Sequence, residues 1–163
     1  MRTAEILVLS TQQHLLEEFR GLFGGELEVH SDNFWMLQYS VDEDYSLICY
    51  GVHLAPRAFL YDWSWIVSNA LGAVYLDSAQ ESLLQKDAEK ALSFLERRFD
   101  LPLVVALRLE TDAHPPLAAH RGGLLIDDGV RFFFYRPQVP ADLRQLIVGL
   151  INLNLEKVQR QSA

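Results

Sequence analysis

The chain begins with a short apolar run that leads into a helical segment through a loop without glycine. Residues 6–9, Ile-Leu-Val-Leu, have the composition of a buried strand, and a helical pattern follows over 12–23. A strand that leads into a helix is half of a crossover unit, which favours a mainly parallel sheet. No glycine stands between Leu9 and Arg20, so this loop is poorly suited to curl its backbone N–H groups around a phosphate.

Apolar runs and helical patterns continue to alternate, which predicts a three-layer α/β domain with a mainly parallel sheet of about six strands. We expect strands at 5–10, 34–41, 45–51, 71–77, 101–108 and 130–135, and helices at 12–23, 57–69, 80–98 and 139–158. In the last helix a spacing of three and four predicts one apolar face that packs on the sheet. Its members are Leu143, Leu146, Ile147, Leu150, Ile151, Leu155 and Val158.

The segment 110–129 is too rich in turn residues for a long helix. Pro115-Pro116 and Gly122-Gly123 interrupt it, so the region where a fourth helix would stand is reduced. Asp128-Gly129 between apolar runs is also a hairpin signal. We prefer a parallel sixth strand over 130–135 and keep the hairpin as the alternative.

Composition limits the class of protein and its partners. A chain of 163 residues, 50% hydrophobic, is expected to form one domain over 1–163. Its formal net charge of −8 argues against nucleic acid or an anionic membrane as a partner, because both attract clusters of Lys and Arg. The single cysteine, Cys49, lies in a predicted central strand and suits a buried thiol in a reducing compartment. With no signal peptide or spanning segment in view, we expect a cytoplasmic protein.

Three stretches of the chain carry a family resemblance. They are residues 47–53 (Leu-Ile-Cys-Tyr-Gly-Val-His), 71–78 (Leu-Gly-Ala-Val-Tyr-Leu-Asp-Ser) and 101–107 (Leu-Pro-Leu-Val-Val-Ala-Leu). In their order and amino-acid sequence they resemble the bacterial Ras-like small GTPases. This group includes the gliding-motility GTPases and relatives of the signal-recognition-particle receptor beta subunit. The resemblance extends over residues 5–158 and implies a Ras-like fold of the P-loop NTPase class.

The resemblance places the phosphate-binding loop of that family on unsuitable residues. The degenerate loop positions are Ser10, Leu15, Leu16 and Glu17, and an ungapped alignment puts the family's lysine at Leu16 and its magnesium-binding hydroxyl at Glu17. Leucine supplies no charge, and a carboxylate repels a polyphosphate unless a metal intervenes. The switch II pattern falls on 51–55, Gly-Val-His-Leu-Ala, where its glycine and its water-orienting glutamine are both missing.

The guanine-reading motif of the family is also lost. It corresponds to Arg108 through Thr111, with Asp112 one position late. Arginine has no acceptor to offer a base edge, so guanine selectivity is not expected.

These losses predict a pseudo-GTPase that is not an enzyme, has no cofactor and acts as a protein-binding regulatory or scaffold module. Two alternatives stay open: a nucleotide-binding switch with a non-standard P-loop, and a receiver-like signalling domain. A metal site from Asp112, His114 and His120 matches no compact zinc pattern, and surface histidines are the better interpretation. The family resemblance implies a Roadblock-type dimer or a signalling protein as the partner.

Large aromatic residues gather at the positions that correspond to the two switches. They are Phe34, Trp35, Phe59, Tyr61, Trp63 and Trp65. Alternate spacing from 59 to 65 cannot place all four residues on one helical face, so some should reach the surface if that helix forms. Because large aromatic groups are favoured at interface hot spots, we predict that this edge contains the partner site. The alternative is that they fill the space left by an absent nucleotide.

Overall fold

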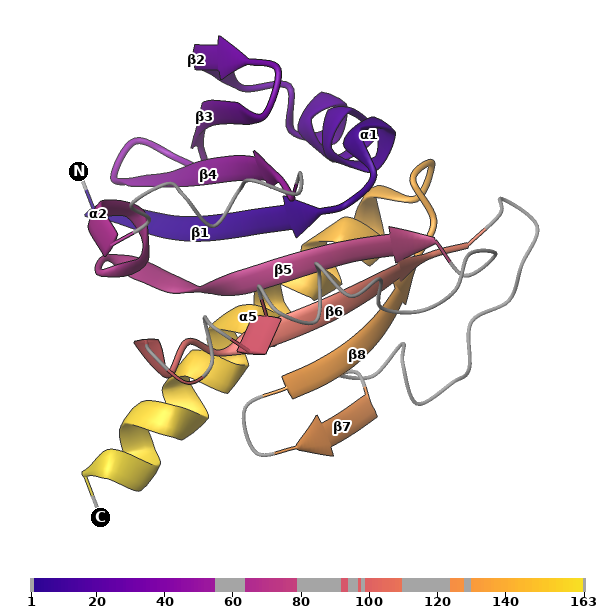
Figure 1. Ribbon diagram of the computed structural model, residues 1–163. Coiled ribbons are helices and arrows are strands. Elements are labelled where there is room, and N and C mark those ends of the chain that lie inside the picture. Colours follow the sequence, from indigo (N-terminus) through magenta and orange to yellow (C-terminus); the bar gives the residue numbers. More distant parts are fainter. Residues whose placement is uncertain are drawn as a thin grey trace.

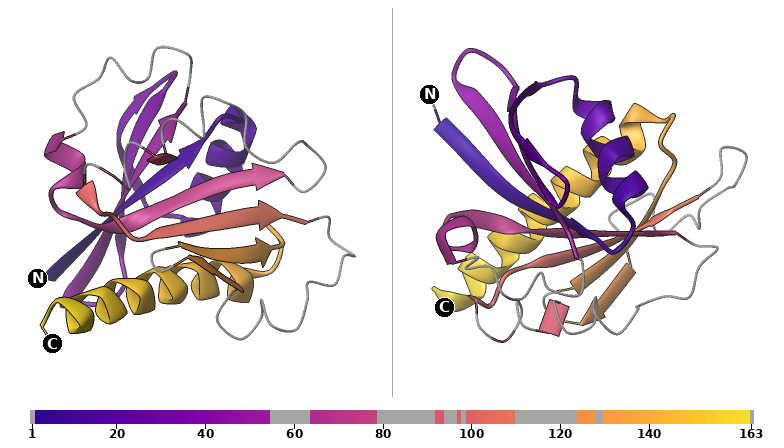
Figure 2. Two further views of the ribbon diagram at one scale, coloured as in Figure 1. Left: turned by 60° about the horizontal axis from the view of Figure 1, so that its bottom comes forward. Right: turned by 45° about the horizontal axis from the view of Figure 1, so that its top comes forward.

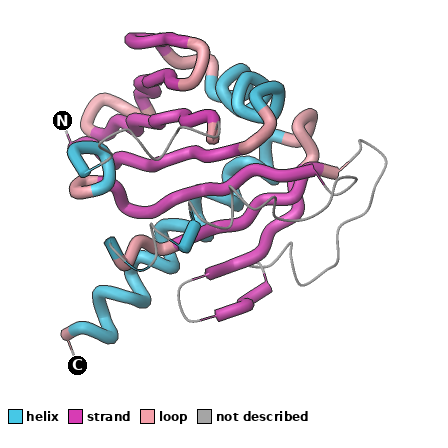
Figure 3. Tube along the Cα trace, in the orientation of Figure 1, coloured by secondary structure: helices cyan, strands magenta, loops and turns pink. Residues whose placement is uncertain are grey.

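The computed structural model describes residues 2–54, 64–78, 92–93, 97, 99–109, 124–127 and 130–162, and the statements below concern these residues (Figures 1 and 3). Its helices and strands, in chain order, are β1 (Arg2–Ser10), α1 (Gln13–Phe23), β2 (Glu26–Ser31), β3 (Phe34–Ser40), β4 (Tyr45–His53), α2 (Ser64–Val67), β5 (Ala70–Ser78), β6 (Leu103–Arg108), β7 (Leu124–Asp127), β8 (Val130–Tyr135) and α5 (Pro140–Gln161).

The strands form one eight-stranded sheet in the order β2-β3-β4-β1-β5-β6-β8-β7 (Figure 1). The five central strands, from β4 to β8, run parallel, while β2, β3 and β7 pair antiparallel with their neighbours. The structure therefore confirms the predicted α/β class and its mainly parallel sheet. An antiparallel meander beside β1 is not the all-parallel order of a receiver domain, which weakens that alternative.

The two faces of the sheet carry separate apolar cores, because successive strand residues point to opposite sides. One core contains Ile6, Val8, Val74 and Val104 and is covered by α1 and α5. The other contains residues such as Leu7, Leu9, Ala73 and Val105 and is covered by α2. Figure 2 shows α5 running along one side of the sheet. Cys49 is buried in the first core, as predicted, and burial raises the pKa of its thiol to about 12.

The edges of the sheet differ most from the sequence prediction. Strand β2 was not predicted, and it makes β3 the second strand from the edge. The hairpin kept as an alternative is present, since β7 pairs antiparallel with β8, and the preferred parallel strand is present too, since β8 pairs parallel with β6. The first helix ends as expected at Gly24, which has φ +59° in the left-handed region that glycine tolerates.

The remaining helical predictions are only partly described by the structure. Of the helix expected over 57–69, residues 64–67 form α2, and the positions before residue 64 lie outside the described residues. The expected helix at 80–98 and the reduced region after residue 109 lie almost wholly outside them. Among the helices that the structure describes, none is long and apolar enough to cross a membrane.

The prediction of one apolar face on the last helix is confirmed for Leu143, Leu146 and Leu150 and is wrong for three other members. Leu146, Leu150 and Leu153 of α5 are buried against the sheet, but Ile151, Leu155 and Val158 are exposed on the outer side. Two polar side chains of α5 contact groups elsewhere in the chain: the Asn154 amide donates to the Leu71 carbonyl oxygen at 2.7 Å, and Lys157 pairs with the exposed Asp100 at 2.7 Å.

Candidate functional site

The candidate site lies at the carboxyl edge of the parallel strands, where ligands of open α/β sheets bind. Ser10 at the end of β1 is in register with His53 at the end of β4. Ser78 at the end of β5 is in register with Arg108, and Arg108 with Tyr135 of β8. The topology therefore brings Ser10, predicted as a degenerate loop position, and Arg108, predicted as a degenerate base-reading position, to one edge.

The loop between β1 and α1 is a tight turn of two residues, Thr11 and Gln12. The fully buried Ser10 hydroxyl donates to the Leu76 carbonyl oxygen at 2.9 Å and accepts from the Gln12 backbone N–H at 2.9 Å. This local side-chain bond engages a backbone donor that a phosphate-binding loop would turn toward its ligand. The Gln12 N–H is thus already hydrogen-bonded within the turn.

An acidic residue lies directly beside this turn. Asp77 of β5 is 2% exposed, and its Oδ1 accepts from the Gln12 side-chain amide at 3.0 Å and from the Ser78 backbone N–H at 2.8 Å. A carboxylate in this place opposes an incoming polyphosphate through like-charge repulsion. Among the described residues, no group of three or more His, Cys, Asp or Glu side chains is placed to hold a metal ion. Neither Gln12 nor Asp77 was singled out from the sequence.

His53 links three segments at the same edge. Its Nδ1 lies 3.0 Å from Asn33 Oδ1, between β2 and β3, and its Nε2 lies 3.2 Å from the Thr11 carbonyl oxygen. The histidine at the family's switch II position therefore holds the β1–α1 turn to the β2–β3 connection.

The positions aligned with the family's lysine and magnesium ligand do not face this edge as a pair. Leu15 and Leu16 are 0% and 2% exposed and belong to the core under α1. Glu17 is partly exposed and pairs with Arg20 one turn later at 2.5 Å. Leu16 therefore serves as a core residue under α1.

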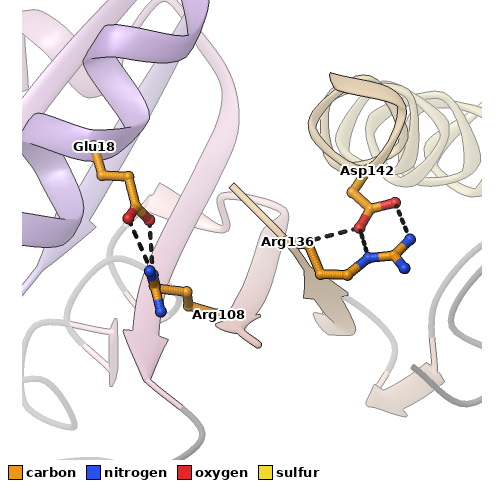
Figure 4. A network of polar contacts seen from close by, with 4 residues as sticks. All are labelled: Glu18, Arg108, Arg136 and Asp142. Carbon is orange, nitrogen blue, oxygen red and sulfur yellow. Dashed lines mark hydrogen bonds and ion pairs between the residues drawn. The ribbon is translucent and has the colours of Figure 1, made fainter. Parts of the chain in front are cut away.

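The Arg108 side chain is bound by Glu18 of α1. Its Nε donates to both carboxylate oxygens of Glu18, at 2.9 and 3.1 Å (Figure 4). Both side chains are about a quarter exposed, so water screens the pair only in part. The other base-reading positions, Thr111 and Asp112, lie outside the described residues.

A second group of side chains, the aromatic cluster, forms on the opposite face of the sheet from α1. We define it as Phe34, Tyr50 and Trp65. The Trp65 ring meets Tyr50 edge to face at 5.7 Å and Phe34 at 6.2 Å, and Phe34 stacks on Tyr50 at 6.4 Å. Trp65 is 57% exposed, Phe34 is half-buried and Tyr50 is buried. Two of the residues predicted for the partner site, Phe34 and Trp65, thus lie together.

Trp35 does not belong to this cluster, and its prediction as a surface residue is corrected. It is 2% exposed and belongs to the core under α1 and α5, because neighbouring residues of a strand point to opposite faces. Its indole lies over Gly51, where an added Cβ would stand 1.9 Å from Trp35 Cε2. Phe59, Tyr61 and Trp63 lie outside the described residues.

Tyr50 anchors the cluster to β1. Its hydroxyl donates to Glu5 Oε2 at 3.0 Å. Burial raises the pKa of Tyr50 to about 12, and the hydrogen bond and negative charge of Glu5 act in the same direction. Sequence reasoning missed Tyr50, although its place beside Phe34 follows once β3 and β4 are paired.

Comparisons with known proteins bear on the fold. No protein-family model matches the chain, and no curated protein matches it in sequence. Solved structures do match: GDP-bound IFT22 of T. brucei has a TM-score of 0.52 and 17% identity over 95% of this chain and 97% of that one. GTP-bound T. brucei IFT22/74/81 has a TM-score of 0.55 and 16% identity over 95% and 98%. Nucleolar GTP-binding protein 1 of Plasmodium falciparum has a TM-score of 0.61 and 12% identity over 98% and 90%.

The chain has a small GTPase-like α/β fold. The neighbours are GTP-binding proteins, two of them solved with GDP or GTP, and this finding contradicts the expectation that the chain is not an enzyme. We withdraw that expectation. At 12–17% sequence identity the similarity shows the fold alone. The nucleotides and proteins bound by the neighbours are properties of those neighbours.

Proposed function

We propose that this chain is a degenerate member of the Ras-like fold that works in the cytoplasm as a protein-binding regulatory module. The partner surface is centred on the exposed Trp65 with Phe34 beside it. The observation that supports it most directly is the 57% exposure of an indole that stands on two other aromatic rings. A large apolar group held in place by neighbours is the kind of anchor that dominates binding at interfaces.

The carboxyl edge of the sheet supports the same proposal. There the Ser10 turn, Asp77 and the Glu18–Arg108 pair engage groups that a nucleotide site would direct at its ligand. A second candidate is a nucleotide-binding switch with a non-standard P-loop, and it is favoured by the GDP- and GTP-bound state of the T. brucei neighbours. The two candidates differ in whether a nucleotide is needed for the partner to bind.

A Roadblock-type dimer is the partner class that we propose first, from the family resemblance. One structural neighbour was solved together with other proteins, IFT74 and IFT81, which is a property of that neighbour and a precedent for partners of this fold. Protein binding needs no basic surface, and a chain of net charge −8 is unsuited to nucleic acid or an anionic membrane.

The test is a titration of the purified chain with a purified Roadblock-domain dimer, without added nucleotide. We expect saturable binding that Trp65→Ala weakens at least tenfold, because an interface anchor contributes on the order of 2 kcal/mol. The matched control is Val41→Ala, since Val41 is 58% exposed in the turn between β3 and β4 and does not belong to the aromatic cluster. Binding that appears only with GTP would favour the switch, and equal binding by both variants would exclude this surface.

A further inference from the structure

Helix α5 carries a second row of apolar side chains that nothing in the described chain covers. Val148, Ile151, Leu155 and Val158 are 54%, 38%, 53% and 51% exposed. They lie opposite the residues that pack on the sheet, and Figure 2 (left) shows the outer side of α5 free of other described elements. Four large apolar residues on one outward stripe are more than a scatter of single exposed side chains.

The spacing of the stripe is that of a helix pairing surface. The steps of three, four and three residues repeat the a and d positions of a heptad, which keep one seam facing a partner helix. The stripe spans about 15 Å of helix at 1.5 Å per residue. One turn before it, Arg144 occupies the next position of the same seam and is exposed.

The rim of the stripe carries no charge that would repel a similar helix. Gln145, Asn152 and Gln159 flank it on one side. The two charged residues within its C-terminal half point elsewhere: Glu156 pairs with Arg131 at 2.5 Å, and Lys157 pairs with Asp100. A partner therefore needs an apolar stripe of matching length with a neutral rim.

We propose that the occupant is the α5 helix of a second copy of this chain, packed antiparallel about a two-fold axis. In that arrangement Val148 faces Val158 of the partner copy and Ile151 faces Leu155, so the same stripe is complementary to itself. A parallel pair would place Arg144 against its own copy, and like charges at facing core positions disfavour it. The antiparallel pair carries each Arg144 past the end of the partner stripe and also opposes the two helix dipoles.

One helix on each side is a small interface, so the dimer is weak. We expect a dissociation constant on the order of 10 to 100 µM, which is weaker binding than standard-size interfaces give. Sedimentation velocity or light scattering from about 5 µM to 1 mM should show the weight-average mass rise toward twice that of one chain. A mass that stays monomeric over this range overturns the proposal.

Two single substitutions locate the surface. Leu155→Glu places a charge in the centre of the seam and should weaken the dimer at least tenfold. Val41→Glu adds the same charge at a site of similar exposure in the β3–β4 turn and should leave the dimer unchanged. Both variants should keep the melting temperature of the parent, since both side chains are more than half exposed. Equal weakening by both, or by neither, overturns the assignment to α5.

A charge pair tests the antiparallel direction. Val148→Glu alone and Val158→Lys alone should each weaken the dimer. The double variant should recover it, because each acidic group then faces a basic group of the other copy. Failure of the double variant to recover, with an intact fold by circular dichroism, contradicts the two-fold antiparallel pairing. Trp65→Ala should leave the dimer unchanged, so this outcome is independent of the function proposed above.

Discussion

Arg108 Nε lies 2.9 Å from Glu18 Oε1 and 3.1 Å from Glu18 Oε2, which joins the end of β6 to the middle of α1. The residue predicted to stand at the guanine-reading motif is thus part of a partly buried ion pair. In a GTPase-like fold the same edge of the sheet would face the nucleotide. The pair therefore serves two purposes. It holds α1 to the sheet, and it engages the Arg108 Nε–H in a contact within the chain.

A double-mutant cycle measures this pair. Glu18→Gln and Arg108→Gln should each lower the free energy of unfolding by about 1 kcal/mol, with a coupling energy of similar size, since the side chains are only about a quarter exposed. Urea unfolding of the four proteins gives the value. Strict additivity of the two changes would show that the ion pair does not stabilise the fold.

Magnesium-GTP should bind the chain weakly at this edge. The Gln12 backbone N–H already donates to the Ser10 hydroxyl, and the Asp77 carboxylate lies beside the turn. We expect no saturable heat in calorimetry up to about 1 mM nucleotide. A micromolar dissociation constant would contradict this and would favour the switch with a non-standard loop.

Leu16→Lys should not create a phosphate site. Leu16 is 2% exposed in the core under α1, so the new ammonium group would be buried or would force α1 away from the sheet. We expect a loss of stability of about 3 kcal/mol or more and no gain in GTP affinity. His14→Lys is the control, because His14 is exposed on the same helix and should tolerate a charge. A folded Leu16→Lys protein that binds GTP tightly would show that the packing around α1 has been misjudged.

The centre of the sheet could be predicted from the sequence, while its edges could not. Residues 71–76 and 101–107 contain no charged side chain and are largely apolar, as is typical of parallel strands covered on both faces, so their pattern favours buried strands. Strand β2 has the sequence Glu-Leu-Glu-Val-His-Ser, whose charged residues are typical of a protected edge and weaken the strand signal. The β7–β8 hairpin had a clear turn signal, but its pairing with β6 depends on tertiary contacts.

The sequence predictions for Trp35 and for three apolar residues of α5 were wrong, because the side-chain periodicity of each element was not applied residue by residue. Phe34 and Trp35 are adjacent on a strand, so they cannot share a face, and the structure places Trp35 in the core. On α5, residues 151, 155 and 158 keep the helical spacing, but they lie opposite 146, 150 and 153 when counted at 100° per residue. The Glu18–Arg108 pair joins residues 90 positions apart and has no local signal in the sequence.

High pH should destabilise the fold through buried acids. Burial raises the pKa of Cys49, Tyr50 and Tyr75 to about 12, and it raises the pKa of Tyr135 further. Each folded pKa lies above its unfolded value of 9 or 10, so the unfolded chain loses these protons first. Stability is therefore fully present below about pH 9 and is lost as the pH rises toward 12. Urea midpoints at pH 8, 10 and 11 should fall steadily.

The thiol contribution to this pH dependence can be isolated with Cys49→Ala. The variant should be less stable at pH 8, because a buried side chain is truncated, but its stability should fall less steeply than the parent's above pH 9. One group that titrates in the unfolded chain alone changes stability by about 1.4 kcal/mol per pH unit. An identical slope in parent and variant would mean that the thiol is protonated equally in both states.

Two of the three tryptophans of the predicted partner site, Trp35 and Trp65, should differ in how much the fold depends on them. Trp35→Ala removes a side chain that is 2% exposed and packed over Gly51, so it should cost roughly 3 to 5 kcal/mol and unfold much of the protein at room temperature. Trp65→Ala removes a side chain that is 57% exposed, and we expect a loss of less than about 1 kcal/mol. Thermal unfolding by circular dichroism compares the two. If Trp65→Ala proved as destabilising as Trp35→Ala, the indole at 65 would be structural, and its value as a docking anchor would have to be tested by a smaller change such as Trp65→Phe.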